Sequence, residues 1–302
     1  MVVIPDHILR ASATMARIAR LTPDHMQRFR LAYYALYACD CGPNNDPAAC
    51  VAACSIPFDM AFVLTLTQNI PDREPVRGWI FGGVDGDRVP IEKDGIRSSV
   101  AKGLITHLPS AIGHEVSFTL PSLSVWSMPG FVLRHGRCKN LGVPFSRIYL
   151  NIAPHNAIWA LGDLARRFDN LGHNFSVKVL AHPRAYVRRD ACLMYIASDE
   201  AEGALGHIYD SLSRNTIVLR EGVPLFTQTL STGLGFADDP AEFRWGQISH
   251  GEWVCNLFVE AARETEDARV IAKEILWSLD ASGRDPACPG LRSGRTISEF
   301  SA

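Results

Sequence analysis

Residues 175–198 read FSVKVLAHPRAYVRRDACLMYIAS. A first apolar run with one lysine, a turn with three arginines and a second apolar run ending on Tyr195 are typical of a β-hairpin. Alternation along the first strand places Ser176, Lys178 and Leu180 on one face. Because lysine is rarely buried, Lys178 indicates either an edge strand or a polar cavity.

The chain around this hairpin mixes strands and helices. Residues 143–154 predict a strand, and residues 155–174 predict a helix because apolar residues recur there at helical spacing. Further along, we expect a helix over 200–213, one or two strands over 215–226, a glycine-rich loop over 227–252, a helix over 252–279 and a weakly ordered tail over 282–302.

The N-terminal part is helical before it becomes strand-like. Helical spacing covers 24–38 and 57–70, and short strands with Gly-Asp turns follow over 77–100, as a meander beginning at Trp79. We therefore expect an α+β fold, with a mainly antiparallel sheet, helices on one face and a helical N-terminal region. The expected division of one compact unit is a helical region over 1–77, an α+β core over 78–260, and a helix end with a flexible tail over 261–302.

The composition is that of an ordinary globular protein, with 47% hydrophobic and 21% charged residues among 302. A net charge of −2 gives no reason to expect nucleic acid or an anionic membrane as a partner. Asp6, His7 and Arg10 interrupt the stretch where a signal peptide would need apolar residues. No stretch approaches the ~20 apolar residues of a membrane span, so we expect a soluble, cytoplasmic protein.

Four of the eight cysteines cluster in the sequence, at Cys39, Cys41, Cys50 and Cys54. In a chain of this size without a secretion signal they do not suggest a disulfide framework. Four thiolates could hold Zn²⁺. However, Cys50 and Cys54 would also share one face of a short helix as small buried residues. We favour the second interpretation and expect no metal.

Arg184, Arg188 and Arg189 follow Lys178 in the hairpin. Planar guanidinium groups bind pairs of phosphate oxygens. Neighbouring cations and burial both disfavour the charged form of a lysine, so such a lysine can act as a base near neutral pH. A base beside a phosphate site fits β-elimination, in which a Cα proton is removed from phosphoserine or phosphothreonine and phosphate leaves. Hydrolysis at phosphorus usually needs a metal, and no acidic cluster is present to hold one.

Five blocks of the sequence resemble the HopA-type effector family, in the same order and at similar spacing. That family takes its name from a plant-pathogen type III effector. Similar domains in bacterial gene clusters for the thioamitides and class five lanthipeptides work beside a kinase-like protein to dehydrate Ser and Thr. The blocks are GW…DGDRVPIEKDG (78–95), SMPGFVLRHG (127–136), SRIYLNIAP (146–154), FSVKVLAHPRAYVRRDACLMYI (175–196) and GVPLFTQTLSTGLGFADDP (222–240).

The chain is also distantly similar to the phosphothreonine lyase effectors. Those proteins have a strand with a basic residue and a general-acid histidine, then a helix, a strand with the lysine base, an arginine, and a strand ending in tyrosine. The resemblance implies Lys178 as the base, Arg147 as the earlier basic residue, Arg188 or Arg189 as the phosphate-binding arginine, and Tyr195 as the tyrosine that orients the phosphate or the peptide carbonyl.

Two departures from these patterns concern the acid and a later motif. The acid histidine would fall at or next to Tyr149, in a strand without histidine. Tyr149, His155 or His135 would then replace it, or phosphate would leave as a dianion held by arginines. A family element SFG-x-H-R is expected after the glycine-rich stretch, but residues 244–249 read RWGQIS, with His250 next.

The expected function is that of a metal-independent lyase without a cofactor. It would convert phosphoserine or phosphothreonine of a precursor peptide to dehydroalanine or dehydrobutyrine, beside a kinase-like partner in the bacterial cytoplasm. The alternative is a non-catalytic effector or a leader-peptide-binding subunit, in which the basic residues form a docking surface. A catalytic lysine should lie in a concave site, whereas a docking patch should be flat. The expected residues are Lys178, Tyr149 and Tyr195 for catalysis, Arg147, Arg184, Arg188 and Arg189 for phosphate, and His135 and His155 as candidate acids.

Overall fold

The central hairpin has the predicted form. Strands β8 (Phe175–Leu180) and β9 (Cys192–Ala197) pair antiparallel, with Lys178 opposite Leu193. The turn between them contains a short 3-10 helix, η5 (Pro183–Val187). This helix begins at His182, whose side chain accepts a hydrogen bond from the backbone N–H of Arg184.

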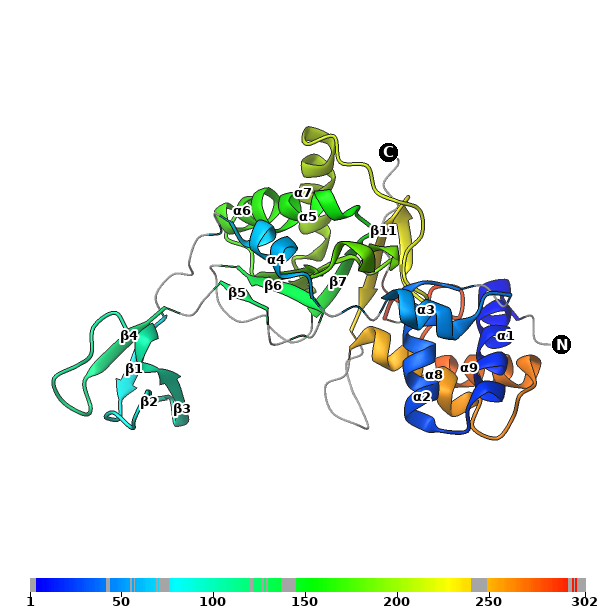
Figure 1. Ribbon diagram of the computed structural model, residues 1–302, viewed down its shortest axis with the longest axis horizontal. Coiled ribbons are helices and arrows are strands. Elements are labelled where there is room, and N and C mark those ends of the chain that lie inside the picture. The colour runs from blue at the N-terminus through cyan, green and yellow to red at the C-terminus, as the bar shows by residue number, and fades with distance from the viewer. Residues whose placement is uncertain are drawn as a thin grey trace.

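The hairpin belongs to an elongated molecule with three parts, and Figure 1 shows the computed structural model with its long axis horizontal. A small sheet lies at one end, a large sheet with its helices lies in the middle, and a helical bundle lies at the other end. The predicted α+β class is confirmed. The structure describes residues 4–41, 44–54, 56, 58–68, 70, 76–119, 122–125, 128, 130–136, 145–239, 249–292, 295 and 297.

The large sheet is antiparallel throughout its described strands. Their order is β10-β11-β7-β9-β8-β6-β5. Strand β8 is therefore an inner strand, flanked by β6 and β9. The remaining bounds are β5 (Leu123–Ser124), β6 (Phe131–His135), β7 (Phe145–Leu150), β10 (Gln228–Ser231) and β11 (Leu234–Asp238).

Helices cover one face of the large sheet. Alternate residues of the inner strands, such as Ile148, Val177 and Met194, point to this face and are fully buried. Phe168 and Leu205 from the covering helices pack into the same core. The bounds are α4 (Met60–Thr67), η3 (Pro154–Asn156), α5 (Ala157–Trp159), the π-helical η4 (Ala160–Leu164), α6 (Ala165–Asn170) and α7 (Ala201–Arg214).

The helical bundle covers part of the second face. Tyr149, Leu193 and Tyr195 point to this face and share one core with the bundle helices. The bundle joins the two ends of the chain, so that α1 and α9 lie side by side (Figure 1). No helix in the described ranges is long and apolar enough to cross a membrane. The bounds are α1 (Asp6–Leu21), α2 (His25–Ala32), the π-helical η1 (Tyr33–Ala38), α3 (Pro47–Cys54), α8 (His250–Ala261) and α9 (Ala268–Ala281).

The C-terminal part differs from the prediction in two ways. The helix expected over 252–279 is divided into α8 and α9, because Asp267 accepts hydrogen bonds from the first N–H groups of α9 and starts a new helix. The tail after 282 was predicted to be weakly ordered, yet Arg284 and Leu291 are each 6% exposed. The Asp238 N–H also donates to Gly290 O at 2.8 Å, which binds this segment to β11.

The stretch before the C-terminal helices also differs from the prediction. Residues 228–238 form the β10–β11 hairpin rather than a loop. Its turn needs glycine at Gly233, where φ is +69° and a Cβ would collide with the carbonyl oxygen of Arg220. Residues 215–226, all of them described, contain no strand. Instead, the Arg220 N–H donates to the carbonyl of Asn151.

The small sheet confirms the meander predicted over 77–100. It has the order β3-β2-β1-β4 and is antiparallel. Phe81, Val89, Ile91 and Phe118 belong to a core of its own. The bounds are β1 (Val76–Phe81), β2 (Arg88–Lys93), β3 (Ile96–Ala101), η2 (Lys102–Leu104) and β4 (Glu115–Phe118).

The cysteine cluster forms two pairs at the start of the bundle. Cys41 and Cys50 form a disulfide, which corrects the expectation that these cysteines would not pair. The sulfurs of Cys39 and Cys54 lie 2.8 Å apart. Within the described residues, no group of three or more His, Cys, Asp or Glu is arranged to hold a metal.

Candidate functional site

Lys178 lies in the middle of the large sheet. Its Cα is paired with Leu133 of β6 on one side and with Leu193 of β9 on the other. The residue is only 8% exposed. An edge-strand role is therefore excluded, because both flanking positions are occupied by strands.

The amine end of Lys178 lies against two aromatic rings. Its Nζ lies 4.2 Å from the centre of the Phe131 ring and 5.6 Å from the centre of the Tyr195 ring. An arginine also lies over each ring. Arg188 Cζ is 5.1 Å from the centre of the Phe131 ring, and Arg147 Cζ is 4.7 Å from the centre of the Tyr195 ring. Three cationic groups thus share two rings. We call these five residues, Arg147, Tyr195, Lys178, Phe131 and Arg188, the Lys178 site.

The strand register explains why these side chains meet. Arg147 of β7 is paired with Tyr195 of β9, and Tyr195 is paired with Ser176 of β8. Ser176 and Lys178 are two residues apart, so they point to the same face. Arg147, Tyr195 and Lys178 therefore follow one another across three neighbouring strands, on the face that the helical bundle partly covers.

Each arginine of the site is held by an aspartate. Arg147 donates from Nε and Nη2 to Asp239, the second bond measuring 2.8 Å. Arg188 donates to Asp190 from Nε at 2.7 Å and from Nη2 at 2.6 Å. Burial alone would lower the pKa of Arg188, but the charge and hydrogen bonds of Asp190 raise it overall. Both guanidinium groups are therefore oriented by bidentate ion pairs.

Lys178 differs from its neighbours in having no such partner. Among the described residues, no carboxylate lies within ion-pair distance of it. Its Nζ instead lies beside the Tyr195 ring, 5.6 Å from the ring centre. Asp239 and Asp190 balance the charges of the two arginines, and Lys178 has no carboxylate of this kind among the described residues. A buried lysine without a carboxylate is uncommon, which makes Lys178 a candidate functional residue.

Tyr195 lies between the lysine and Arg147. Arg147 Nη1 donates to the Tyr195 hydroxyl at 3.3 Å. Burial raises the pKa of Tyr195, but the positive charges of Lys178 and Arg147, together with the hydrogen bond from Lys178, lower it overall. The phenol is therefore a better proton donor than an ordinary tyrosine.

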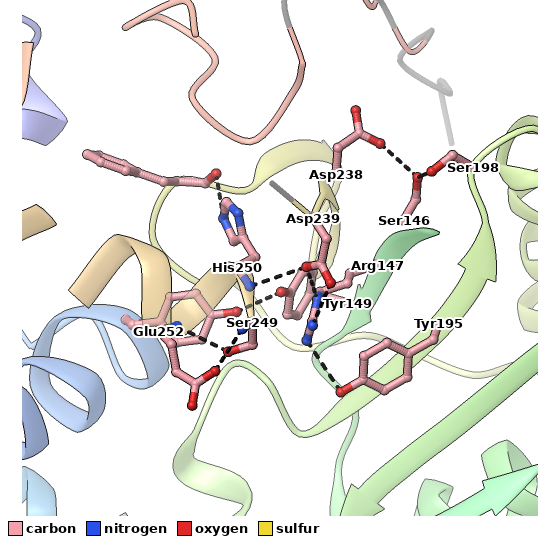
Figure 2. A network of polar contacts seen from close by, with 12 residues as sticks. Ser146, Arg147, Tyr149, Tyr195, Ser198, Asp238, Asp239, Ser249, His250 and Glu252 are labelled. Carbon is pink, nitrogen blue, oxygen red and sulfur yellow. Dashed lines mark hydrogen bonds and ion pairs between the residues drawn. The ribbon is translucent and has the colours of Figure 1, made fainter. Parts of the chain in front are cut away.

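Asp239 connects Arg147 to the helical bundle (Figure 2). Its Oδ1 also accepts the backbone N–H of His250 at 3.2 Å, at the first turn of α8. Ser249 and Glu252 form a capping box at the same helix start. The neighbouring Asp238 points away from the site, where it accepts from Ser146 Oγ at 2.7 Å.

The candidate acids lie in three different places. Tyr149 is completely buried beneath the bundle, and its hydroxyl accepts from Tyr37 at 2.7 Å. His135 is on the same face as Lys178, with Nδ1 2.9 Å from Ser176 Oγ. His155 is exposed in η3, outside the strand. The structure therefore brings His135 near the Lys178 site and keeps His155 away from it.

Arg184 and Arg189 also lie outside the site. Arg184 is exposed in η5. Arg189 Nη1 binds Asp40 at 2.5 Å, and its backbone N–H donates to Ala38 O, so the residue joins the hairpin to the bundle. Of the four arginines expected to bind phosphate, Arg147 and Arg188 are those that approach Lys178.

Sequence reasoning missed the acidic partners and one ring of the site. Asp190 directly follows the two arginines of the hairpin, and Asp239 lies in the FADDP segment, so both were visible as charges near the expected residues. Phe131 gave no signal beyond its place in an apolar strand. The RWGQIS segment lies outside the described residues apart from Ser249. His250 is fully buried, with Nε2 3.1 Å from Phe226 O.

Comparison with known proteins places the chain in a family. The profile of the HopA1 effector protein family matches residues 129–291, more than half of the chain, which include the whole Lys178 site but not the small sheet. No curated protein sequence matches.

Two solved structures of effector proteins resemble this one. The effector from Pseudomonas syringae pv. syringae strain 61 has a TM-score of 0.50 and 15% identity, over 94% of this chain and 98% of its own. The effector from Pseudomonas syringae pv. tomato strain DC3000 has a TM-score of 0.49 and 18% identity, over 95% and 99%. At these identities the likeness to the strain 61 protein concerns the fold alone. The chain belongs to the HopA1 effector protein family.

Proposed function

We propose that this protein is a metal-independent lyase that removes phosphate from phosphoserine or phosphothreonine in a peptide. The observation that carries the proposal is Lys178, a buried lysine between two aromatic rings and two arginines, without a carboxylate partner among the described residues. A lysine held in this way can serve as the base of a β-elimination. Neutral Lys178 accepts the Cα proton, the Cα–H electrons form the Cα=Cβ bond, and the Cβ–O bond breaks.

Arg147 and Arg188 supply the positive charge that this reaction needs. As phosphate leaves, negative charge gathers on its oxygens, and guanidinium groups in a buried site stabilise that charge strongly. Asp239 and Asp190 fix both guanidinium groups before the substrate arrives, which reduces the reorganisation required. Lys178, lying between them, is within reach of a residue whose phosphate they hold.

The substrate and the partner follow from the same proposal. The substrate is a phosphorylated precursor peptide in the bacterial cytoplasm, the product contains dehydroalanine or dehydrobutyrine, and a kinase-like protein supplies the phosphate. Neither nucleic acid nor a membrane has a part. Exposed Met60 and Leu64, one turn apart on α4, support a protein contact on an N-terminal helix, because they are 53% and 59% exposed.

The alternative is a non-catalytic effector or a leader-peptide-binding subunit. One observation favours it, since Asp239 and Asp190 occupy donors of Arg147 and Arg188 that a phosphate would otherwise use. Burial argues against a docking surface. Arg147, Lys178 and Arg188 are 6%, 8% and 4% exposed, so none can lie flat against a partner protein.

The deciding experiment is mass spectrometry of a synthetic phosphothreonine peptide incubated with the purified protein and EDTA. We expect a peptide that has lost phosphoric acid. Lys178→Met, which keeps the apolar stem and removes the amine, should abolish this loss while phosphopeptide binding remains. Lys102→Ala, at an exposed lysine of the small sheet, is the matched control and should behave as the wild type. An unmodified peptide, even with the kinase-like partner and its natural substrate present, would favour the binding alternative.

A further inference from the structure

Elimination of phosphate is accelerated by a proton donor as well as by a base. When the Cβ–O bond breaks, the bridging oxygen carries away the bonding electrons, and the leaving group is far more stable if that oxygen is protonated. General acids typically contribute a factor of about 100 to 10,000 to such steps. The histidine that resemblance led us to expect is missing from β7, so either another group donates the proton or phosphate leaves as a dianion held by arginines.

We infer that Tyr195 is the general acid, and that its contact with Lys178 returns the proton after each turnover. The inference rests on the proposed lyase function. Its geometric basis is that Arg147 Nη1 donates to the Tyr195 hydroxyl at 3.3 Å, and that Lys178 Nζ lies 5.6 Å from the centre of the Tyr195 ring. Acid and base are then adjacent side chains on neighbouring strands, so one substrate residue can reach both.

The proton movements balance without any further reactant. Neutral Lys178 accepts the Cα proton and becomes an ammonium group, while the Tyr195 hydroxyl gives its proton to the departing phosphate oxygen and becomes a phenolate. The two charges lie beside each other, and Lys178 then passes its extra proton to the Tyr195 oxygen. Both side chains are restored, and the products are the dehydrated peptide and hydrogen phosphate.

The surroundings of Tyr195 suit this cycle. Lys178 and Arg147 stabilise a phenolate by charge and hydrogen bonding and lower the pKa of Tyr195 against the opposing effect of burial, while Asp239 acts weakly in the opposite direction. A phenol of lowered pKa donates a proton more readily near neutral pH. The phenolate is also buried, so the positive charges act on it with little screening by water.

The rival donors are less well placed. Tyr149 is fully buried beneath Tyr37, and burial raises the pKa of Tyr149. His155 is exposed outside the strand. His135 lies on the correct face and, like Tyr195, is paired with Ser176, but its Nδ1 lies 2.9 Å from Ser176 Oγ and its ring makes no cation–π contact with Lys178 among the described residues. Of the candidate donors, Tyr195 is the one whose ring lies against the proposed base, with Lys178 Nζ 5.6 Å from the ring centre.

The test compares two leaving groups. Sulfate leaves as a weakly basic anion that needs no proton, so an O-sulfothreonine peptide bypasses the acid and still requires the base. In single-turnover measurements, Tyr195→Phe should slow phosphate elimination by about 100- to 10,000-fold but slow sulfate elimination by no more than about tenfold. Tyr186→Phe is the matched control, because it removes another buried hydroxyl from the same hairpin, one that donates to Leu180 O.

The outcomes separate this inference from the proposed function. If the wild type eliminates neither group, the lyase proposal and this inference both fail. If the wild type is active and Tyr195→Phe slows both leaving groups equally, the lyase stands and the role of Tyr195 is refuted. The same holds if His135→Gln, and not Tyr195→Phe, produces the loss that is specific to phosphate.

A second replacement tests the inference even if Tyr195→Phe folds poorly. Tyr195→3,5-difluorotyrosine keeps the ring and the hydroxyl but lowers the pKa of the phenol. Because a general acid must be protonated, the alkaline limb of the pH profile for phosphate elimination should move to lower pH. The profile for the sulfate peptide should keep its alkaline limb. A merely structural tyrosine would move neither limb.

Discussion

Asp239 binds Arg147 through Nε and Nη2, and this bidentate contact aims the third nitrogen, Nη1, at the hydroxyl of Tyr195. The aspartate also accepts the His250 N–H at the start of α8 (Figure 2). One carboxylate therefore ties the orientation of a site arginine to the attachment of the helical bundle. Stability and activity should both depend on it, in ways that can be separated.

Asp239→Ala should destabilise the protein and impair elimination. It leaves the Arg147 guanidinium buried without its partner, which typically costs about 3 to 5 kcal/mol of unfolding free energy. The free energy can be measured by urea denaturation. Asp210→Ala is the matched control, because that carboxylate pairs with Arg167 at 2.9 Å but is 55% exposed. Its loss should cost no more than about 1 kcal/mol.

A double variant separates the two effects. Arg147→Met combined with Asp239→Ala removes both charges, so much of the lost stability should return. Elimination should stay impaired, because the guanidinium group is absent. A double variant that recovers activity along with stability would show that Arg147 acts only in the fold.

Lys178→Met should abolish elimination without lowering the stability of the protein. The lysine is buried without a carboxylate among the described residues, so replacing its amine by an apolar group should leave the unfolding free energy unchanged or raise it by up to about 2 kcal/mol. Val177→Ala, at the next position of the same strand, should instead lower it by about 1 to 3 kcal/mol, because Val177 is fully buried in the apolar core. A large loss of stability in Lys178→Met would identify the lysine as a structural residue.

The sequence allowed part of this site to be predicted. Alternation in a strand depends only on neighbouring residues, so the common face of Ser176 and Lys178 followed directly. The hairpin register then brought Tyr195 beside them. The ion pairs of the site were harder to predict from the sequence, because Arg147 and Asp239 are 92 residues apart and are brought together only by the strand order. Asp190, two residues after Arg188, was the local sign that the arginines are paired.

Errors in the fold also trace to tertiary contacts. The apolar run around Ile217 and Val218 favoured a strand. Yet Arg220, two residues later, bonds through its N–H to Asn151 O and through Nη2 to Asn151 Oδ1 at 2.6 Å, and these contacts hold the segment as an irregular connection. The C-terminal segment reads as polar and glycine-rich. Its order comes from arginines that bind the chain around Asp238, a contact that no local pattern reveals.

Reduction of the disulfide should weaken the helical bundle. Cys41 and Cys50 close a short loop, with a sequence separation of nine, between η1 and α3. A loop of this size should contribute about 2 to 3 kcal/mol of unfolding free energy. Urea denaturation with and without dithiothreitol measures that difference. Cys192→Ser is not a suitable control, because Cys192 is buried in the apolar core. The control is the double variant Cys41→Ser with Cys50→Ser, which lacks the disulfide. Dithiothreitol should therefore leave the unfolding free energy of this variant unchanged.

His250 should make the protein sensitive to acid. Burial, together with the charges of Arg284 and Arg147, lowers the pKa of His250 well below its usual value of 6.5, and its Nδ1 has no hydrogen-bond partner among the described residues. In the unfolded chain this histidine binds a proton near pH 6.5, whereas in the folded protein it does so only at lower pH. The contribution to stability is therefore complete above 6.5 and is lost as the pH falls below it, by about 1.4 kcal/mol for each pH unit.

The measurement is urea denaturation from pH 7.5 to pH 5 for the wild type and for His250→Gln. In the variant, the slope of the unfolding free energy against pH should be smaller by the contribution of one bound proton. Burial also lowers the pKa values of His7 and His207, and these two histidines contribute to the remaining slope in both proteins. Val259→Ala, at a buried position of the same helix, should reduce stability by a similar amount at every pH. If His250→Gln keeps the full acid dependence, then His250 is protonated in the folded protein, and the buried neutral ring inferred from its contacts is wrong.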